Sequence, residues 1–325
     1  VAYSYYYLMK DLLEQIKSLR VLVIGDVMLD RYIIGDVSRI SPEAPVPVLA
    51  VRDERSVAGG AANVALNLRS LGANVEAIGW FGQDERGDQL VEILGNQEIQ
   101  VDHSFRFSAV PTISKSRVTA SNQQICRVDR ESSIDQYHPD LSIVGDLISE
   151  KACQADAVIV SDYGKGFVTN QLLALVRENA SFLAVDPKPS RLLDYSKPDL
   201  LTPNRLEALE LAGLSRETRD PFPQEDVVNQ IFNKFSPRLL AVTLGGEGML
   251  LAKQGKVERT IPTAAREVFD VSGAGDTVIA SLSMALVAGQ SFEQAAEFAN
   301  LAAGVVVGKV GTANVSPEEI IALSS

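Results

Sequence analysis

The stretch D-V-S-G-A-G-D-T, from Asp270 to Thr277, opens a long helical part of the chain. Its small residues Gly273, Ala274 and Gly275 let the backbone approach a ligand closely. The start of a helix also presents unpaired N–H groups and the positive end of the helix dipole. These features predict a cradle for a phosphate in transit, with Asp276 placed to accept the proton of an attacking hydroxyl. Taken alone, the motif fits a carboxylate that only stabilises the helix start equally well.

A second motif, G-G-A-A-N-V-A from Gly59 to Ala65, also precedes a helical stretch. Gly59 and Gly60 allow close backbone approach to a polyhydroxy ligand, and Asn63 offers both donors and acceptors. Taken alone, this motif is explained better by a tight turn into a helix than by a ligand site.

A third motif, G-D-V-M-L-D-R-Y from Gly25 to Tyr32, directly follows the first apolar run. Open α/β sheets bind ligands at the carboxyl ends of their strands. Asp26 and Asp30 are therefore candidates to accept hydrogen bonds from sugar hydroxyls. Solvated loop acids are the alternative.

Short apolar runs bounded by turns predict buried strands, and helical patterns separate several of them. The strands are expected at 21–24, 75–78, 157–160, 182–185, 239–244 and 249–252, and the helices at 8–19, 60–71, 86–95, 140–152, 169–179, 204–212, 224–235 and within 275–308. Alternating strands and helices indicate an α/β fold with a mostly parallel central sheet and helices on both faces.

Two segments, 31–57 and 104–130, interrupt this alternation with a partial β pattern and no helix. They are expected to pair away from the main sheet as a small β lid over the site. An elaborated sheet edge is the alternative. With no repeat and no flexible linker, residues 1–325 are expected to form one catalytic domain with this lid.

Composition excludes several functional classes. The net charge of -12 makes nucleic acid and anionic membranes poor partners, because bulk repulsion opposes binding. Two cysteines and two histidines form neither a disulfide framework nor a metal site of known spacing. The sequence shows neither a long apolar span nor a signal-peptide pattern at its start, so a cytoplasmic location is expected.

These motifs, in this order, resemble the ribokinase-like carbohydrate kinase family over about residues 20–318. The resemblance implies a ribokinase-like fold, ATP and Mg²⁺ as cofactors, Asp276 as catalytic base, and an anion hole at Gly273, Ala274 and Gly275. It also implies that Glu207 organises the metal. The nucleotide residues that it implies are Asn204, Glu207, Thr243, Gly245, Gly246, Gly248, Asn300 and Ala303. Arg205 departs from the family's Asn-Glu-x-Glu element, which leaves the contacts at that position open.

Within the family, four stretches resemble the bacterial heptose 7-phosphate kinases. They are GDVMLDRY, SRISPEAPVPV, SDYGKG at 161–166 and DPK at 186–188. The implied reaction phosphorylates the anomeric hydroxyl of D-glycero-D-manno-heptose 7-phosphate to the 1,7-bisphosphate, for ADP-heptose and lipopolysaccharide synthesis. Some such kinases are fused to a nucleotidyltransferase domain, which these 325 residues are not expected to include. A homodimer is compatible with the resemblance.

The basic residues support a phosphorylated substrate. Segment 104–130 carries five basic residues against one acid, a local charge of +4 in an acidic protein. Phosphate recognition needs such cations. The alternative is that these residues form a solvated basic strand face that binds no ligand. The candidate substrate residues are Asp30, Gly59, Gly60 and Asn63, with Lys115, Arg117, Arg127, Lys165 and Lys188 as candidate cations. Lys188, just after a strand, is the first choice for the substrate's phosphate.

Other functional classes fit less well. A dinucleotide-binding oxidoreductase carries Gly-x-Gly-x-x-Gly after its first strand, and a Walker-type NTPase carries Gly-x4-Gly-Lys-Ser/Thr. Neither pattern is present. A non-catalytic sugar-binding module is expected to lose Asp276 and Glu207, which this chain keeps. A kinase for another sugar, such as fructose or ribose, remains the main alternative.

Overall fold

The fold is built on an eight-stranded sheet, seen in a computed structural model that describes residues 2–120, 123–215, 221–265, 270–309 and 313–323, with side chains from Leu8 onward. The strands run in the order β14-β13-β12-β11-β10-β9-β1-β4. The six from β12 to β4 are parallel, and β13 and β14 are antiparallel at one edge. Their bounds are β1 (Arg20–Gly25), β4 (Asn74–Ile78), β9 (Ala157–Ser161), β10 (Leu183–Asp186), β11 (Leu200–Leu201), β12 (Leu239–Thr243), β13 (Met249–Lys253) and β14 (Lys256–Ile261).

All six strands predicted from apolar runs are present, and this confirms the mostly parallel sheet. Two strands were missed. β11 has only two residues, and β14 is an edge strand in which exposed positions outnumber buried ones. Neither gives the apolar run that marks a buried strand.

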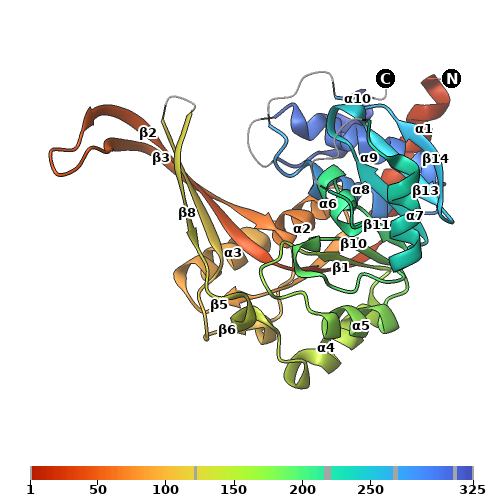
Figure 1. Cartoon of the computed structure of the whole chain (residues 1–325), viewed down its shortest axis with the longest axis horizontal. Helices are drawn as coiled ribbons and strands as arrows, with labels where there is room; N and C mark the ends of the chain where they lie inside the picture. Colours follow the sequence, from red (N-terminus) through yellow and green to blue (C-terminus); the bar gives the residue numbers. More distant parts are fainter. Residues whose placement is uncertain (1, 121–122, 216–220, 266–269, 310–312, 324–325) are drawn as a thin grey trace.

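Helices cover both faces of this sheet (Figure 1). Helices α2, α8 and α9 pack together against one face, while α4 packs on β1, α6 on β12 and α7 on β14. The helices are α1 (Ala2–Ile16), α2 (Ala61–Ser70), α3 (Glu85–Gly95), α4 (Leu141–Gln154), α5 (Asn170–Asn179), α6 (Arg205–Leu211), α7 (Gln224–Phe235), α8 (Ala274–Val287), α9 (Phe292–Val307) and α10 (Pro317–Leu323). Short 3-10 turns occupy His103–Phe105, Ile134–Tyr137, Pro189–Arg191 and Gly245–Glu247. Over the described parts of the chain, no helix is both long and apolar enough to cross a bilayer.

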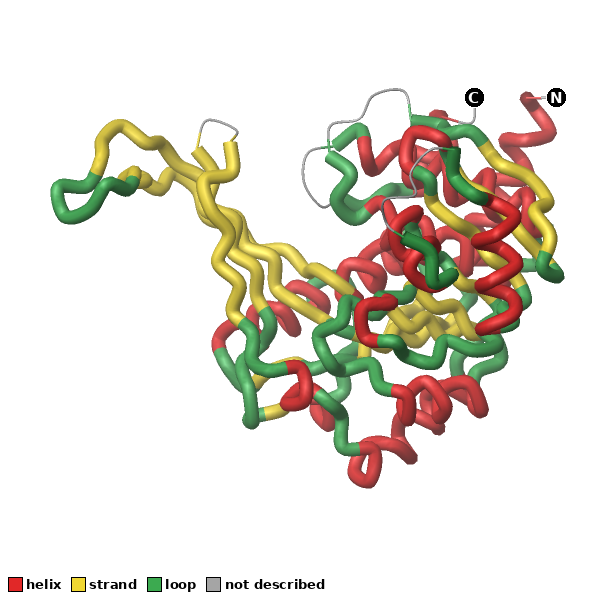
Figure 2. The backbone as a smooth tube through the Cα atoms, viewed as in Figure 1, coloured by secondary structure: helices red, strands yellow, loops and turns green. Residues whose placement is uncertain are grey.

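A second sheet projects from the body of the molecule (Figure 2). It contains β2 (Val27–Ile40), β3 (Pro47–Gly60), β7 (Ser114–Ala120) and β8 (Gln123–Arg130), in the order β3-β2-β7-β8. The two predicted β segments therefore pair with each other away from the main sheet. Residues 121–122 of the second segment lie outside the described residues.

The observed strands differ from the predicted segments at their ends. β2 begins at Val27, directly after β1, and β3 runs on to Gly60, directly before α2. The projecting sheet is thus continuous with the core at the point where β1 ends. Residues 106–107 form β6 (Arg106–Phe107), which pairs with β5 (Phe81–Gly82) in a separate two-stranded sheet.

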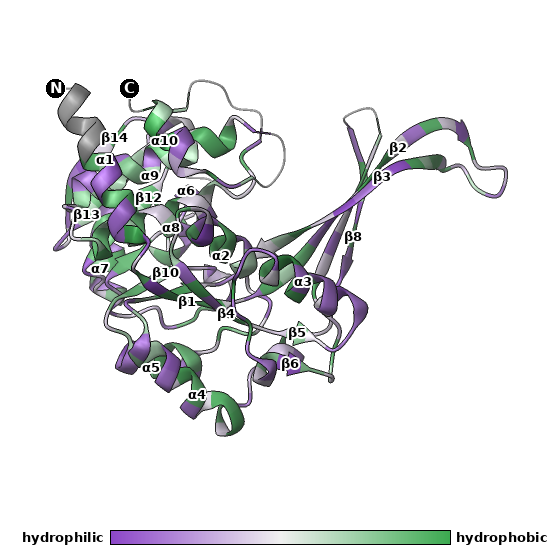
Figure 3. Cartoon of the chain, turned by 180° about the vertical axis from the view of Figure 1, so that it is seen from behind, coloured by the Kyte–Doolittle hydropathy of each residue, from purple (hydrophilic) through white to green (hydrophobic). Residues whose placement is uncertain are grey.

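The two faces of the projecting sheet differ in chemistry. Strand pairing places Asp30 beside Lys115, and Arg117 beside both Tyr32 and Arg127. Because neighbouring side chains of a strand point to opposite faces, these residues share one face. Apolar residues such as Val128 lie on the other, and the strands show mixed hydropathy along their length (Figure 3).

Candidate active site

The candidate site lies at the carboxyl ends of the parallel strands, the edge where open α/β sheets bind ligands. A cavity of about 200 Å³ opens there. Strands β9, β10, β11 and β12 and the start of α8 contribute its walls. The lining residues are Asp162, Tyr163, Asp186, Lys188, Thr202, Asn204, Glu207, Thr243, Gly273, Gly275 and Asp276.

The start of α8 forms the predicted cradle. Gly273 is the N-cap residue with a φ of 81°, a left-handed conformation that favours glycine, and Ala274 begins the helix. Gly275 has no heavy atom within 4 Å of where a Cβ would stand, so its position is open to a ligand. The structure thus brings Gly273, Gly275 and Asp276 to one wall of the cavity.

Asp276 is held by two donors from distant parts of the chain. The Asn63 Nδ2 group donates to Oδ2 at 2.6 Å, and the Tyr163 hydroxyl donates to Oδ1 at 2.5 Å. The side chain is only 4% exposed. An ionised carboxylate has about four lone-pair positions, so two remain for a substrate hydroxyl.

Burial raises the pKa of Asp276 to about 6, even though the bonds from Tyr163 and Asn63 oppose the rise. Burial disfavours the charged form of a carboxyl group. A base with a pKa just below neutral is ionised at pH 7 and accepts a proton more readily than an ordinary aspartate.

The two glycines before α2 are required by close backbone contacts. A Cβ on Gly60, whose φ is 60°, would stand 2.3 Å from the Asp26 carbonyl oxygen. A Cβ on Gly59 would stand 2.6 Å from Asp30 Oδ2. These contacts let β3 lie against the end of β1, and they bring Asn63 in the first turn of α2 to Asp276.

Asp26 and Asp30 have different surroundings. Asp26 is buried, and its carboxylate accepts three backbone N–H bonds, from Tyr163, Lys165 and Phe167, at 2.8–2.9 Å. The structure therefore does not support the interpretation of Asp26 as a sugar ligand, because its oxygens are used in holding a loop. Asp30 pairs with Arg117 at 2.9 Å.

The opposite wall of the cavity holds the predicted nucleotide and metal residues. Asn204 caps α6 in a capping box: its side chain accepts from the Glu207 backbone N–H, and the Glu207 carboxylate accepts from the Asn204 backbone N–H. Glu207 also pairs with Lys188 Nζ at 2.8 Å. Thr243 bridges to Asn204 across the ends of β11 and β12.

Two further carboxyl groups, Asp186 and Asp162, line this cavity. Burial and the charges of Glu207 and Asp276 raise the pKa of Asp186 well above its ordinary value. Burial and the charge of Asp26 raise the pKa of Asp162 to about 7. Such a set of carboxylates favours a bound cation.

The predicted glycine loop follows β12. Gly245 and Gly248 have φ values of 61° and 95°, and Gly246 has open space where a side chain would stand. Arg205, the departure from the family element, forms an ion pair with Glu247 in this loop. That contact ties the start of α6 to the loop.

The predicted nucleotide residues Asn300 and Ala303 lie on α9. Asn300 donates to the Pro262 carbonyl at 2.7 Å and accepts from the Ala264 N–H at 3.3 Å. It therefore fixes the segment after β14. Ala303 is half-buried nearby on the same helix and is not among the residues that line the 200 Å³ cavity.

Four of the five candidate cations form an ion pair with a carboxylate. Arg117 pairs with Asp30, Arg127 with Asp129, Lys165 with Glu131 and Lys188 with Glu207. Lys115 is the exception, because no ion pair joins it to any carboxylate among the described residues. Burial and the nearby cations Lys165, Arg117 and Arg127 lower its pKa, whereas Asp30 opposes the change. Its Nζ lies 5.9 Å from the centre of the Tyr163 ring.

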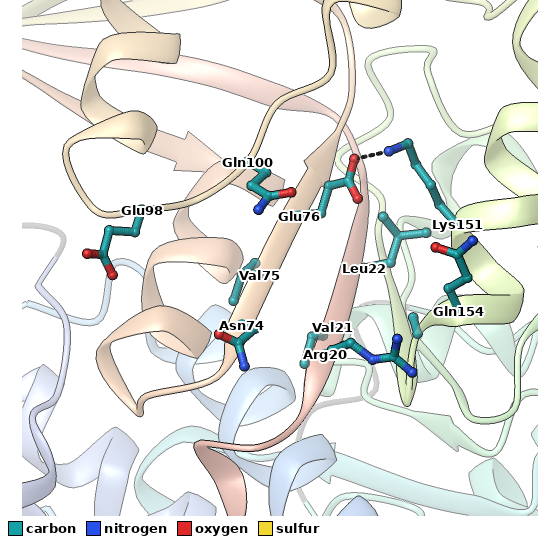
Figure 4. Close-up of a pocket in the computed structure, with 11 residues that line it drawn as sticks. Arg20, Val21, Leu22, Asn74, Val75, Glu76, Glu98, Gln100, Lys151 and Gln154 are labelled. Atoms are coloured by element: carbon teal, nitrogen blue, oxygen red, sulfur yellow. Dashed lines mark ion pairs between the residues drawn. The ribbon is translucent and has the colours of Figure 1, made fainter.

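Another cavity, of about 260 Å³, opens at the amino-terminal ends of β1 and β4 (Figure 4). Its main cation, Lys151, pairs with Glu76 at 2.5 Å and with Asp102 at 3.4 Å. The charge of Lys151 is therefore compensated by carboxylates of the fold itself. This cavity lies at the sheet end opposite to the predicted motifs.

A comparison with protein-family models matches residues 18–319 to the description "pfkB family carbohydrate kinase". The chain belongs to this family of carbohydrate kinases. It is therefore a phosphotransferase that acts on an alcohol group, and the family uses ATP as phosphate donor.

Relatives and solved structures agree with this membership. The chain is 40% identical over 305 residues to "Bifunctional protein HldE" of Sulfurimonas denitrificans, which covers 93% of this chain and 63% of the relative. It is 42% identical to the protein of the same name from Alcanivorax borkumensis, over 93% of this chain and 62% of the relative. The chain thus spans under two thirds of the length of these relatives.

The fold is similar to that of Arabidopsis thaliana ribokinase, solved with ribose and ATP, with a TM-score of 0.76 and 23% identity over 94% of this chain and 99% of the other. Phosphofructokinase-2 from Escherichia coli, in a tetrameric inhibited form, gives a TM-score of 0.75 with 20% identity over 94% and 98%. These likenesses confirm the ribokinase-like fold predicted from the motifs.

Sequence reasoning missed four residues that line this cavity, Asp162, Tyr163, Asp186 and Thr202. The first two lie in the SDYGKG stretch, from which only Lys165 was selected, and Asp186 begins the DPK stretch. For the first three, the position directly after two predicted strands was the available signal, because ligands bind at strand carboxyl ends.

We predict that kcat/KM falls as the pH drops through about 6, because protonated Asp276 cannot accept a proton from the substrate. A pH series of ADP release between pH 5 and 9 measures this.

We also predict that Asp276→Asn lowers turnover by roughly 10² to 10⁴ at every pH, the usual contribution of a general base, with ATP affinity preserved. Turnover of the variant within a few-fold of the wild type would remove Asp276 from the role.

Proposed function

We propose that this kinase transfers the γ-phosphate of ATP to the anomeric O1 of D-glycero-D-manno-heptose 7-phosphate, giving the 1,7-bisphosphate. The observation that carries the proposal is Lys115, a half-buried cation that forms no ion pair with a carboxylate among the described residues. It lies on the sheet face that meets Tyr163 beside Asp276. Similarity to HldE proteins over most of the chain supports the heptose. The bisphosphate would serve ADP-heptose and lipopolysaccharide synthesis in the cytoplasm.

Lys115 suits the substrate's own phosphate for an electrostatic reason. Removing an ammonium group from water is unfavourable unless an anion compensates it. Each of the other four candidate cations already has a carboxylate. A phosphate bound at Lys115 would compensate this charge while the far end of the sugar reached Asp276.

Lys188, the first choice from sequence, better suits the donor phosphates. It lines the same cavity as Asp276 and pairs with Glu207 on the predicted nucleotide side. We therefore propose that Lys188 and the N–H groups at the start of α8 stabilise the phosphate being transferred. Asp276 accepts the proton of the attacking hydroxyl, and Asn63 orients that base.

We propose that Mg²⁺ accompanies ATP and is organised by Glu207. The carboxylates around the cavity supply the oxygen chemistry that Mg²⁺ prefers. In the described residues, no group of three or more acidic, histidine or cysteine side chains is arranged to hold a metal ion. One or two carboxylates with substrate phosphates is the usual way in which kinases hold Mg²⁺, and the metal offsets phosphate charge.

A kinase for a free sugar, such as fructose or ribose, is the alternative function. It has no need for a cation at the far end of the acceptor. The choice of acceptor therefore separates the two proposals.

We predict that removing the 7-phosphate from the heptose lowers kcat/KM for the wild-type enzyme, and that Lys115→Met largely abolishes this difference. Loss of one charged contact costs about 1.5 to 3 kcal/mol, or about 10- to 150-fold in KM for the sugar phosphate, with the KM for ATP spared. Lys253→Met, at an exposed position of β13, is the matched control and should change neither constant.

The same prediction tests the lid. Because Lys115 lies on β7, binding of the sugar phosphate should draw the projecting sheet over the cavity and slow hydrogen exchange in residues 114–120. Lys115→Met should lose that slowing. Equal kcat/KM for the two acceptors would show that no phosphate site exists and would favour the free-sugar kinase.

We predict that Glu207→Gln raises the Mg²⁺ concentration needed for half-maximal rate, since the amide lacks the charge that attracts the metal. Glu210→Gln, on the same helix but not on the cavity wall, is the control. A Mg²⁺ titration of both variants measures the effect. An unchanged midpoint for Glu207→Gln would contradict the assignment.

We propose that a second copy of the chain covers the projecting sheet. Apolar side chains of this sheet stand in solvent, which is unusual for a single copy. They include Ile40, Val51 and Val128, and Val46 is exposed in the connection between β2 and β3. A homodimer would bury them while leaving the Lys115 face for substrate.

We predict that Val128→Glu lowers the molar mass measured by light scattering from that of a dimer to that of a monomer, because it places a charge in the interface. Ile143→Glu changes an even more exposed apolar residue, on α4, and should leave the mass unchanged. A monomeric wild type, or a dimer that persists in Val128→Glu, would refute this interface.

A further inference from the structure

The loop after β9 brings one side chain to the proposed base that no motif assigned. The Tyr163 hydroxyl donates to Asp276 Oδ1 at 2.5 Å, on the opposite side of the carboxylate from Asn63. Its ring also faces Lys115 of the projecting sheet, with 5.9 Å from Nζ to the ring centre. Tyr163 therefore contacts both the base and the lysine assigned to the substrate phosphate.

Tyr163 is fixed by its backbone as well as by its hydroxyl. Its N–H donates to Asp26 Oδ2 at 2.9 Å, and two later N–H groups of the same loop donate to the same carboxylate. Glycines at 164 and 166, with φ values of 70° and 121°, let the loop turn around it. A side chain held at both ends can orient another group precisely because it loses little further entropy.

The direction of the hydrogen bond follows from the charges. Burial and the neighbouring Asp276 raise the pKa of the Tyr163 hydroxyl well above its ordinary value, so it keeps its proton. Tyr163 is thus the donor and Asp276 the acceptor. A hydrogen bond to the charged form of a carboxyl group favours that form.

We propose that Tyr163 is a positioning residue for the base: its hydroxyl holds Asp276 Oδ1 so that the carboxylate stays ionised and its free lone pairs point at the acceptor hydroxyl. Asp26 acts indirectly, because it holds the loop that carries Tyr163. The proposal rests on the role of Asp276 given above.

Other charged groups around Asp276 do not replace this contact. Asp30 on β2 raises the pKa of Asp276 and Lys115 on β7 lowers it. Asp186 after β10 is a further like charge. Among the described residues, Tyr163 and Asn63 are the side chains whose hydrogen bonds to this carboxylate lower its pKa.

The test compares pH profiles of kcat/KM for the full chain with ATP, Mg²⁺ and heptose 7-phosphate. Tyr163→Phe keeps the ring and removes only the donor, so the acid midpoint should rise by about one pH unit. At pH 6 the rate should fall about fivefold relative to the wild type, and at pH 8 it should lie within a few-fold. A uniform loss at all pH values, with an unmoved midpoint, would overturn the proposal.

Tyr137→Phe is the matched control. Tyr137 is buried, and its hydroxyl donates to the Pro111 carbonyl at 3.0 Å, far from the base in the sequence and off the cavity wall. It should lower the Tm without moving the acid midpoint, and an equal movement would show a nonspecific effect. Near-normal turnover of Asp276→Asn would overturn both roles, whereas an inactive Asp276→Asn with an unmoved midpoint in Tyr163→Phe would overturn only that of Tyr163.

Discussion

The buried carboxylate of Asp26 joins the parts of the molecule on which the site depends. It ends β1, stands where the projecting sheet begins, and accepts three backbone N–H bonds from the loop after β9. Charge-assisted bonds of this kind are stronger than neutral ones, and an unsatisfied buried carboxylate is costly. The loop therefore has one favoured path, and that path carries Tyr163 to Asp276. The geometry of the proposed base follows from a contact between two strand ends that are more than a hundred residues apart in sequence.

The sequence was sufficient to predict elements whose signal is local. Apolar runs marked six strands of the main sheet, and the small residues before Asp276 marked the start of α8. The sequence did not show which polar groups meet across the fold. Asp26 and Tyr163 are each ordinary loop residues until the parallel pairing of β1 with β9 brings them together. For the same reason the sequence did not show that Lys188 pairs with Glu207, which lies in the first turn of α6.

Charge pairing around the site separates cations used within the fold from one available to a ligand. The sequence offered five candidate cations and favoured Lys188 among them. In the fold, carboxylates pair with four of them, Lys188 included. These ion pairs fix the direction of the four side chains. Among the described residues, Lys115 is the candidate that no carboxylate pairs with, and Asp30 is the nearby acid that partly offsets its charge.

The acidic character of the cavity constrains how a nucleotide can enter it. Asp162, Asp186, Glu207 and Asp276 surround a space of about 200 Å³. Burial raises the pKa values of Asp162, Asp186 and Asp276, and the charges of Glu207 and Asp276 raise that of Asp186 further. Free ATP is a polyanion, so such a cavity would repel it. Among the described residues on its wall, the one lysine is Lys188, which is paired with Glu207. A nucleotide that arrived with a metal ion would bring positive charge to these carboxylates and would lower the pKa of Asp276, which favours the ionised form that the proposed base requires. The proposed metal, nucleotide and base would then be coupled through one electrostatic field rather than through separate contacts.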